Sequence, residues 1–484
     1  MYTTKDCKLV IEHLDEIIKN ADNLSATIIR PTHNDLRILF GIVLNFVIEK
    51  KRKIYGGFAL NKLLESVEKK DMIYDIDDIT KWDIDFYSPT PIEDAREISL
   101  RIFEKGYKHI LAREAQHDET YTIFAETKNI ADITYVPKNI YNKMPFVVID
   151  NIHITSPHFM LIDYFRVITD PLTSYYRLDK TFNRLCLIAK HFPLPEYDNT
   201  ITISPLSNEL DVAFSIVHDF IINKPSLVVV GMYAFNHLIR EIKTDIKTVD
   251  INYYEVISTN YKIDAKNMIL ELQKRINIYG KTSITYKENY PFFQYLGYNV
   301  DIYYDNIIIC RMYHYNIKCI PYNTVPAIYF NNNLQITKTG TIQIGSYAIL
   351  MLYNLINVMW AKTTSDSNTE ELYYNLLSHM VQYKTYYFKH TDKTILDESL
   401  FQEFILRCVG ETVSPQMEKA LRIELKMKLG KKYSWCFNPE KDAKVVTKYV
   451  FKNSSGGPIN NVKNNKIDLL SVSTTGSLIE FDDE

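Results

Sequence analysis

Apolar residues recur with two different periods along the chain, and each change of period marks a new structural element. Between residues 8 and 50 they recur every three to four positions, most clearly in Leu36–Val47, which predicts helices that end at a charged run. Lys53–Tyr55 then predicts a short strand that breaks at Gly56 and Gly57. The segment after these glycines, with leucines on one face, predicts another helix.

A second set of patterns completes one compact group of elements. Trp82–Tyr87 alternates as a strand does, and Thr90–Glu93 predicts a helix start with a capping box and proline in the first turn. Tyr121–Ala125 and Ile130–Tyr135 predict a hairpin that turns at Lys128-Asn129. We therefore expect an α+β fold, a small mixed sheet backed by helices.

The same order of patterns occurs again in the second half of the chain, which indicates a duplicated fold. Five segments have later counterparts in the same order. The pairs are Gly56–Asn61 with Gly231–Asn236, Asp83–Tyr87 with Asp250–Tyr254, Asp94–Arg96 with Asp264–Lys266, Asp132-Ile133 with Asp301-Ile302, and Ile152–Ser156 with Ile342–Ser346.

These patterns predict five regions. They are an N-terminal helical region (1–50), a first α+β domain (51–195), a second copy of it (196–365), a mainly helical extension (366–452) with one helix from Ser414-Pro415 to Gly430, and a disordered tail (453–484).

The charge balance excludes a globally basic nucleic-acid-binding protein. The net charge is −3 and the isoelectric point is about 6.5. A nucleic acid would have to follow a local basic track on such a protein.

The cysteines and the apolar runs indicate an intracellular protein outside the membrane. None of the six cysteines forms a CxxC pair or has a histidine at metal-ligand spacing, so we expect free thiols in a reducing compartment. The acidic residues near the N-terminus do not fit a secretory signal. The longest apolar runs, Ile38–Ile48 and Tyr347–Trp360, are too short or too interrupted to cross a bilayer and predict core helices.

Three acidic residues in the first copy fit a metal site. Asp83 and Asp85 lie two positions apart on a predicted strand, so both carboxylates leave the same face, and Asp132 lies on a later strand. Mg²⁺ prefers carboxylate oxygens, and paired ions stabilise the attacking and leaving oxygens of a phosphoryl transfer. Asp75-Ile76-Asp77 is a competing pair, but its charged surroundings indicate a solvated loop.

Gly56 and Gly57 supply the second half of a phosphate site. A turn without side chains at the start of a helix lets backbone N–H groups approach a triphosphate. An isolated Gly-Gly or Asp-x-Asp is weak evidence, whereas both in this order with a strand aspartate are much stronger.

Gly56-Gly57, Asp83-Ile84-Asp85 and Asp132 resemble the signature of the DNA polymerase β-type nucleotidyltransferase superfamily. Tyr55–Asn61 and Trp82–Tyr87 are most similar to the poly(A) polymerase catalytic subunits of poxviruses and giant viruses. The resemblance implies a nucleotidyltransferase fold present twice, one copy active and one degenerate. It also implies metal ligation by Asp83, Asp85 and Asp132. Superfamily members often have Ser after the first glycine, where Gly57 stands here.

The second copy is expected to be inert. In the pairing given above Asn252 stands in place of Asp85, and an amide lacks the anionic oxygen that a two-ion site needs. The Gly-Gly turn has become Gly231-Met232.

Two basic segments are further candidates for binding. Lys180 and Arg184 lie on one face of a predicted helix and could reach the triphosphate, although a solvated helix face is an equal alternative. Lys431, Lys432, Tyr433 and Trp435 combine positive charge with stacking groups, as single-stranded RNA requires, and a surface helix followed by a buried Trp is the alternative.

Together the residues and the resemblance predict a template-independent poly(A) polymerase that adds AMP from ATP to RNA 3′ ends with two Mg²⁺ or Mn²⁺ ions. A homodimer or a processivity subunit would hold the RNA, and the location would be the host cytoplasm or the virion. The alternatives are a CCA-adding or terminal uridylyl enzyme, or a non-catalytic RNA-binding processivity subunit.

Overall fold

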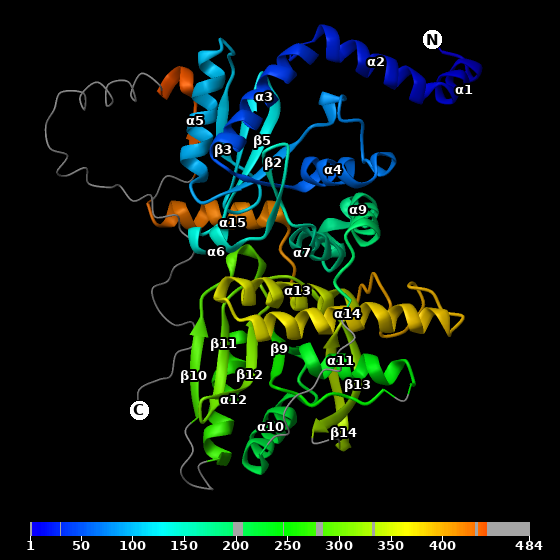
Figure 1. Cartoon of the computed structure of the whole chain (residues 1–484), viewed down its shortest axis with the longest axis vertical. Helices are drawn as coiled ribbons and strands as arrows, with labels where there is room; N and C mark the ends of the chain where they lie inside the picture. The colour runs from blue at the N-terminus through cyan, green and yellow to red at the C-terminus, as the bar shows by residue number, and fades with distance from the viewer. Residues whose placement is uncertain are drawn as a thin grey trace, which may run out of the picture. The chain divides into compact units, whose positions relative to one another are not determined.

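A computed structural model describes residues 2–29, 31–196, 207–244, 246–276, 284–331, 334–430 and 434–442. The chain forms two compact units. Unit 1 consists of Met1–Ser156 and Pro415–Lys463, and unit 2 consists of Pro157–Ser414 and Asn464–Glu484. Each unit has one eight-stranded sheet backed by helices, so the α+β expectation is confirmed (Figure 1). The five expected regions stay predictions, and the 453–484 tail lies outside the described residues.

The sheet of unit 1 has the strand order β16-β3-β4-β5-β2-β1-β7-β6. The strands are β1 (Lys53–Tyr55), β2 (Ile84–Ser88), β3 (Leu111–Glu114), β4 (Thr120–Ala125), β5 (Lys128–Tyr135), β6 (Phe146–Ile149), β7 (Ile152–Thr155) and β16 (Cys436–Phe437). The helices are α1 (Thr4–Glu12), α2 (Leu14–Ile28), α3 (His33–Glu49), α4 (Gly56–Val67), α5 (Pro91–Glu104), α6 (Lys138–Lys143) and α15 (Pro415–Lys428).

The sheet of unit 2 has the strand order β10-β11-β12-β9-β8-β14-β13-β15. The strands are β8 (Leu227–Val230), β9 (Tyr254–Ser258), β10 (Ile284–Asn289), β11 (Asn299–Tyr304), β12 (Ile307–His314), β13 (Ile320–Asn331), β14 (Leu334–Gly345) and β15 (Cys408–Val409). The helices are α7 (Pro157–Ile168), α8 (Pro171–Ser174), α9 (Leu178–His191), α10 (Asn208–Ile221), α11 (Gly231–Glu241), α12 (Tyr261–Ile276), α13 (Tyr347–Thr364) and α14 (Ser367–Lys389).

The two sheets repeat the same topology over seven strands. Strands β5 and β1 lie beside β2, the first parallel and the second antiparallel, and β12 and β8 lie in the same way beside β9. Parallel pairing of β1 with β7 matches that of β8 with β14. The fold is therefore present twice, as the sequence repeat indicated.

Helix α3 forms because its apolar residues fall on one stripe. Leu39, Phe40, Val43, Phe46 and Val47 are all fully buried, and the spacing is that of one helix face. The stripe packs on the sheet, where the Phe46 and Phe86 rings lie 6.3 Å apart. The run that contains Tyr347–Trp360 is likewise a core helix, α13, buried at almost every position.

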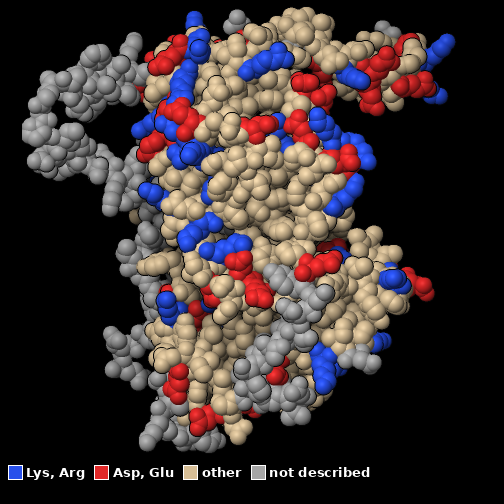
Figure 2. All heavy atoms as spheres, viewed as in Figure 1, with Lys and Arg blue, Asp and Glu red and all other residues tan. Residues whose placement is uncertain are grey.

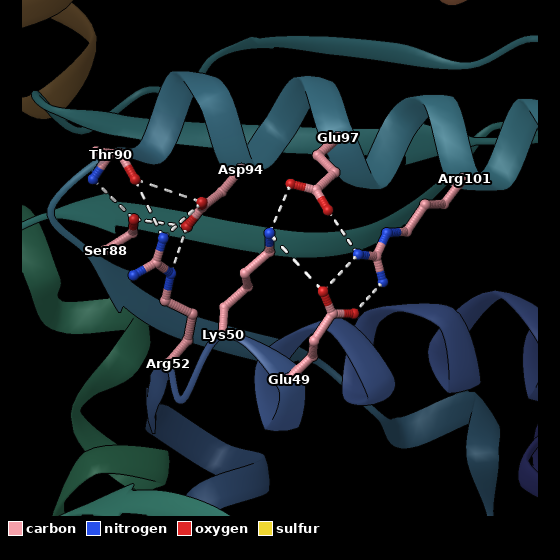
Figure 3. A network of polar contacts seen from close by, with 8 residues as sticks. All are labelled: Glu49, Lys50, Arg52, Ser88, Thr90, Asp94, Glu97 and Arg101. Atoms are coloured by element: carbon pink, nitrogen blue, oxygen red, sulfur yellow. Dashed lines mark hydrogen bonds and ion pairs between the residues drawn. The ribbon is translucent and has the colours of Figure 1, made fainter.

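A polar cluster at the end of β2 fixes the start of α5 (Figure 3). Arg52 donates to both carboxylate oxygens of Asp94 at 2.7 Å, and the Ser88 hydroxyl donates to the same carboxylate at 2.6 Å. Thr90 precedes the helix as its N-cap residue but makes no capping hydrogen bond, and its hydroxyl accepts from Arg52 instead. The expected capping box is therefore wrong, because the Thr90 hydroxyl is hydrogen-bonded to Arg52 within the polar cluster.

The same cluster occurs in unit 2. The Ser258 hydroxyl donates to Asp264 at 2.7 Å, and Lys224 lies 4.0 Å from the other oxygen of that carboxylate. Asn61 and Asn236 are also equivalent, since each amide is bonded to a backbone N–H and a carbonyl of the loop after its helix. The duplication thus extends to individual hydrogen bonds.

Two local expectations need correction. The hairpin between β4 and β5 turns at Glu126-Thr127, which both have positive φ, and Lys128 and Asn129 already belong to β5. Cys319 and Cys408 form a disulfide, because the antiparallel pairing of β13 with β15 brings together two residues 89 positions apart. Cys7, Cys186, Cys310 and Cys436 are free, as expected.

Among the described helices, none combines the length and the apolar character that a membrane crossing requires.

Candidate active site

Asp85 and Asp132 lie opposite each other on the neighbouring strands β2 and β5. Because paired residues of adjacent strands point to the same side, both carboxylates leave one face of the sheet from backbones about 4.8 Å apart. Asp83 comes one residue before β2 and two residues before Asp85, which gives it the same face. The structure therefore brings the three predicted carboxylates to one place.

The segment that carries Asp83 is anchored by its neighbour Trp82. The Trp82 indole N–H donates to the carbonyl of Ile76 at 2.9 Å, and the indole ring lies 4.9 Å from the Phe58 ring and 5.8 Å from the Phe40 ring. Asp83 itself is exposed at the entrance to the strand. A half-buried aromatic anchor thus precedes an exposed carboxylate.

The glycine turn lies against the same carboxylates. Tyr55 pairs with Asp85 across β1 and β2, and α4 begins at the next residue, Gly56. Gly56 has a φ of +75°, and a Cβ at this position would collide with the Asp85 carboxylate. Only glycine fits here, and the free backbone N–H groups of the first helical turn begin directly beside Asp85. Gly57 follows as a buried residue of that turn.

Asp132 is half-buried, as Asp85 is, whereas Asp83 is exposed. Burial raises the pKa of its carboxyl, and the negative charge of Asp83 raises the pKa further. Hydrogen bonds from Thr122 and Asn129 act in the opposite direction, and the Asn129 amide lies 3.3 Å from Asp132.

Thr122 and Asn129 were missed by reasoning from the sequence. Thr122 pairs with Asp132 across β4 and β5. The predicted hairpin would therefore have indicated this contact if the register of its two strands had been known. Asn129 was assigned to the turn, where its side chain had no predicted partner. Both residues hold the Asp132 carboxylate.

The donor set fits hard divalent cations, although the ligands are not preformed. Within the described ranges, no three or more His, Cys, Asp or Glu side chains are arranged to hold a metal ion. The negative charge of Asp83 raises the pKa of Asp132, as expected when two carboxylates lie close to each other. A cation between such carboxylates relieves their repulsion, and carboxylate oxygens are the ligands that Mg²⁺ prefers.

The competing acidic pair has the loop structure expected from its surroundings. Asp75 and Asp77 are exposed, and the Asp75 carboxylate accepts from the backbone N–H of Asp77 at 3.0 Å. This is a local turn that belongs to no strand, so the pair lies in a solvated loop.

The basic candidates on α9 and the carboxylates belong to different units. Lys180 and Arg184 are on α9, which belongs to unit 2, and the structure does not include them in the compact unit of the three acids. Lys431, Lys432 and Tyr433 lie outside the described residues.

Trp435 packs within unit 1. Its ring meets that of Tyr121 edge-on at 5.4 Å, the Arg96 guanidinium lies 5.9 Å from it, and its backbone N–H donates to Glu114 at 3.2 Å. These contacts fix Trp435 beside β16, and the ring remains half-buried.

Comparison with known proteins agrees with this geometry. Residues 41–174 match the family model "Poly(A) polymerase catalytic subunit", and residues 187–469 match "APMV, Putative poly(A) polymerase, catalytic subunit, C-terminal". The chain is 33% identical over 493 residues to the "Putative poly(A) polymerase catalytic subunit" of Acanthamoeba polyphaga mimivirus, covering 95% of this chain and 83% of the relative. The chain belongs to the poly(A) polymerase catalytic subunit family.

Two further relatives support the family assignment. The African swine fever virus protein of the same description (strain Badajoz 1971 Vero-adapted) is 30% identical over 160 residues, covering 32% of this chain and 33% of the relative. The crystal structure of the Megavirus polyadenylate synthase superposes with a TM-score of 0.81 at 30% identity, covering 96% of this chain and 94% of that one. The expected poly(A) polymerase family and adenylyltransferase class are confirmed.

The strand register corrects how the second lobe of this polymerase corresponds to the first. Val230 pairs with Glu255 as Tyr55 pairs with Asp85, and a Cβ on Gly231 would meet the Glu255 carboxylate. Glu255, and not Asn252, therefore stands in place of Asp85. The earlier pairing was wrong because Asp250 and Asn252 resemble the motif in identity but precede the strand β9.

The counterpart of Asp132 is also different from the expected one. Arg311 pairs with Glu255 on the parallel strands β12 and β9, which is the position of Asp132 relative to Asp85. Asp301 pairs with Arg311 as Thr122 pairs with Asp132, so Asp301 corresponds to Thr122. The pairing of Asp132 with Asp301 was therefore wrong by one strand.

The polymerase fold has thus replaced a carboxylate with a cation in its second lobe. Arg311 donates to both oxygens of Asp301 at 2.6 and 2.9 Å and lies 4.6 Å from the Trp360 ring. Glu255 is 2% exposed and accepts from the Tyr313 hydroxyl at 2.6 Å and the Asn357 amide at 2.9 Å. The second lobe therefore has a guanidinium at the position of Asp132 and lacks the three-carboxylate set of the first lobe.

Proposed function

We propose that the chain transfers AMP from ATP to the 3′ end of RNA, with two Mg²⁺ or Mn²⁺ ions held by Asp83, Asp85 and Asp132. The observation that supports this most directly is the pairing of Asp85 with Asp132 beside the Gly56 turn. It places an acidic cluster next to a helix N-terminus, and phosphate and metal sites need both.

The residues have separate parts in the proposed reaction. The backbone N–H groups at Gly56 and Gly57 bind the triphosphate at the start of α4. Asp83, Asp85 and Asp132 would hold the divalent ions beside the triphosphate and the RNA terminus, and ions bound there would neutralise phosphate charge and favour the deprotonated hydroxyl. The 3′-oxygen forms a bond to the α-phosphorus, the bond to the β-phosphate oxygen breaks, pyrophosphate leaves and the hydroxyl proton passes to solvent.

Arg184 and Lys180 are proposed to assist at the triphosphate. The Nε of Arg184 is buried and has no hydrogen-bond partner among the described residues, and such a group binds an anion readily. Lys431, Lys432, Tyr433 and Trp435 are proposed to contact the RNA. We also propose that a second copy or a processivity subunit holds the RNA, inside the host cytoplasm or the virion.

The test is a panel of single nucleotides with the full chain, a labelled RNA primer and Mg²⁺ or Mn²⁺. ATP should give long tails, whereas CTP, UTP and GTP should give short extensions or none. Tails from UTP, or CCA addition alone, would assign a different nucleotidyltransferase, and no extension with any nucleotide would indicate a non-catalytic subunit.

A matched pair of variants tests the site itself. Asp85→Asn should lower AMP incorporation by about three orders of magnitude or more while the melting temperature stays unchanged, because a metal ligand contributes chemistry and little stability. Asp75→Asn, in the exposed loop, should behave as wild type. Similar rates for both variants would refute the metal-site assignment.

A further inference from the structure

Unit 2 contains a cavity of about 550 Å³ that has no part in the proposed reaction. Four segments far apart in sequence form its wall: the end of α11 with the loop after it, the middle of β13, the start of β14, and Leu400. Thr324 and Pro326 are exposed, so the cavity opens to solvent along β13. Its volume lies in the range of small-ligand sites.

The polar side of the cavity is suited to an anion. Arg240 and Lys243 both line it, and the guanidinium of Arg240 is held by Gln335 across the cavity. Lys243 is exposed. Glu241 is the one acidic residue among the described residues of the wall. On the face shown in Figure 2, basic and acidic side chains are interspersed.

A buried histidine adds an unused hydrogen-bonding group. His237 lines the cavity at 4% exposure, and its Nε2 has no partner among the described residues. Its ring lies 5.1 Å from the Tyr233 ring and 5.2 Å from the Phe330 ring. Burial, followed by the charge of Arg240, lowers the pKa of His237 to about 3, so the imidazole is neutral. A ligand group that hydrogen-bonds to such a buried, unsatisfied nitrogen is stabilised by the contact.

We propose that this cavity binds one nucleotide of the single-stranded RNA, with the phosphate at Arg240 and Lys243 and the base against Val325, Ile328 and Leu400. The described wall combines two cations for a phosphate, an imidazole nitrogen without a partner among the described residues, and aliphatic side chains for a base. The proposal rests on RNA being the substrate and gives the second lobe a part in holding it.

Fluorescence anisotropy with a labelled oligoadenylate, the full chain and EDTA tests this directly. Arg240→Ala/Lys243→Ala should raise the Kd at least fivefold. It should also make the slope of log K against log salt shallower by about 0.7, the contribution of one phosphate contact to a single strand. Thr324→Trp, which fills the open mouth without changing charge, should raise the Kd by a similar factor and leave the slope unchanged.

The matched control is Lys262→Ala/Lys287→Ala, which removes the same charge from exposed positions of unit 2 outside the cavity. An equal loss of affinity in this control, or wild-type affinity in both cavity variants, would overturn the proposal. Binding of fluorescent mant-AMP that is sensitive to Thr324→Trp, with RNA affinity unchanged, would assign a free nucleotide instead and would also overturn it. The assay contains neither ATP nor divalent ions, so failure of the catalytic proposal does not affect its outcome.

Discussion

Gly56 is expected to contribute both to stability and to the chemistry of the site, and its counterpart Gly231 allows the two contributions to be distinguished. Both residues have positive φ, and at both a Cβ would meet the carboxylate on the neighbouring strand. Gly56→Ala and Gly231→Ala should each destabilise the chain by about 1–2 kcal/mol or more, because alanine is strained in the left-handed region.

Only the first substitution should affect the chemistry. Gly56→Ala displaces Asp85 and fills the approach to the first turn of α4, so AMP incorporation per folded molecule should fall by about two orders of magnitude or more. Gly231→Ala displaces Glu255 in the second lobe and should leave this rate nearly unchanged. Thermal melts give the stability, and primer extension normalised to folded protein gives the rate. Equal loss of rate would mean that Gly56 acts through stability alone.

Thr122 is expected to act through Asp132 and not on the substrate. Its hydroxyl bonds the Asp132 carboxylate, and residues behind a metal ligand typically contribute about 10–100-fold to metal affinity or activity. Thr122→Val should therefore raise the Mg²⁺ concentration for half-maximal activity by about tenfold, whereas Thr122→Ser keeps the hydroxyl and should restore it. A magnesium titration of primer extension measures this. An unchanged magnesium requirement in Thr122→Val would exclude the positioning role.

At the scale of single residues, the sequence predicted the carboxylates but not what holds them. The spacing of Asp83 and Asp85 and the glycine turn follow from local rules of strands and helix starts. The bonds from Thr122 and Asn129 depend on the register of β4 with β5, which contains a shift between Ile123 and Phe124. No local pattern encodes that shift.

At the scale of elements, burial determines which residues of the second lobe form strand β9, whereas the similarity of Asp250 and Asn252 to the motif of the first lobe gave the wrong alignment. All five residues of β9, Tyr254–Ser258, are buried, so this segment forms the strand and Asp250 and Asn252 remain before it. The pairs Asp94 with Asp264 and Ile154 with Ile344 were placed correctly because each lies in an element whose own pattern fixes its position. The additional strands β3 and β6 were missed because each has only four residues.

The sheet of the second lobe should depend on the guanidinium that replaced Asp132. Arg311→Met leaves Asp301 buried without its cation, and breaking a buried pair in this way costs about 3–5 kcal/mol. The double variant Arg311→Met/Asp301→Leu removes both charges and should recover part of that loss. AMP incorporation per folded molecule should be unchanged in both.

Chemical denaturation measures these differences. Arg275→Met is the control, because the Arg275 side chain is 42% exposed. Its surface ion pairs should contribute less than about 1 kcal/mol to the free energy of unfolding. Should Arg311→Met be no less stable than Arg275→Met, the cation would have no structural part in the lobe.

At the scale of the whole molecule, unit 2 contains a histidine that should make it sensitive to acid. His218 is fully buried and lies among the rings of Tyr233, Tyr254 and Tyr329. Burial, assisted by Lys338, lowers its pKa to about 4, while Asp219 acts in the opposite direction. In the unfolded chain a histidine has a pKa of about 6.5.

The sign of the effect follows from these two values. Between pH 6.5 and pH 4 His218 is protonated in the unfolded chain but not in the folded chain. Its contribution to stability is therefore complete above pH 6.5 and is lost as the pH falls toward 4. At pH 5 the loss from His218 should be about 2 kcal/mol, from 1.36 kcal/mol per pH unit. His218→Phe keeps a ring in the aromatic surroundings and removes the proton site. Its melting temperature should therefore fall less than that of wild type between pH 7.5 and pH 5, whereas His390→Phe, at an exposed position, should follow wild type. A wild-type pH dependence in His218→Phe would place the acid sensitivity elsewhere, with His237 as the next buried histidine to replace, because its pKa is lowered even further.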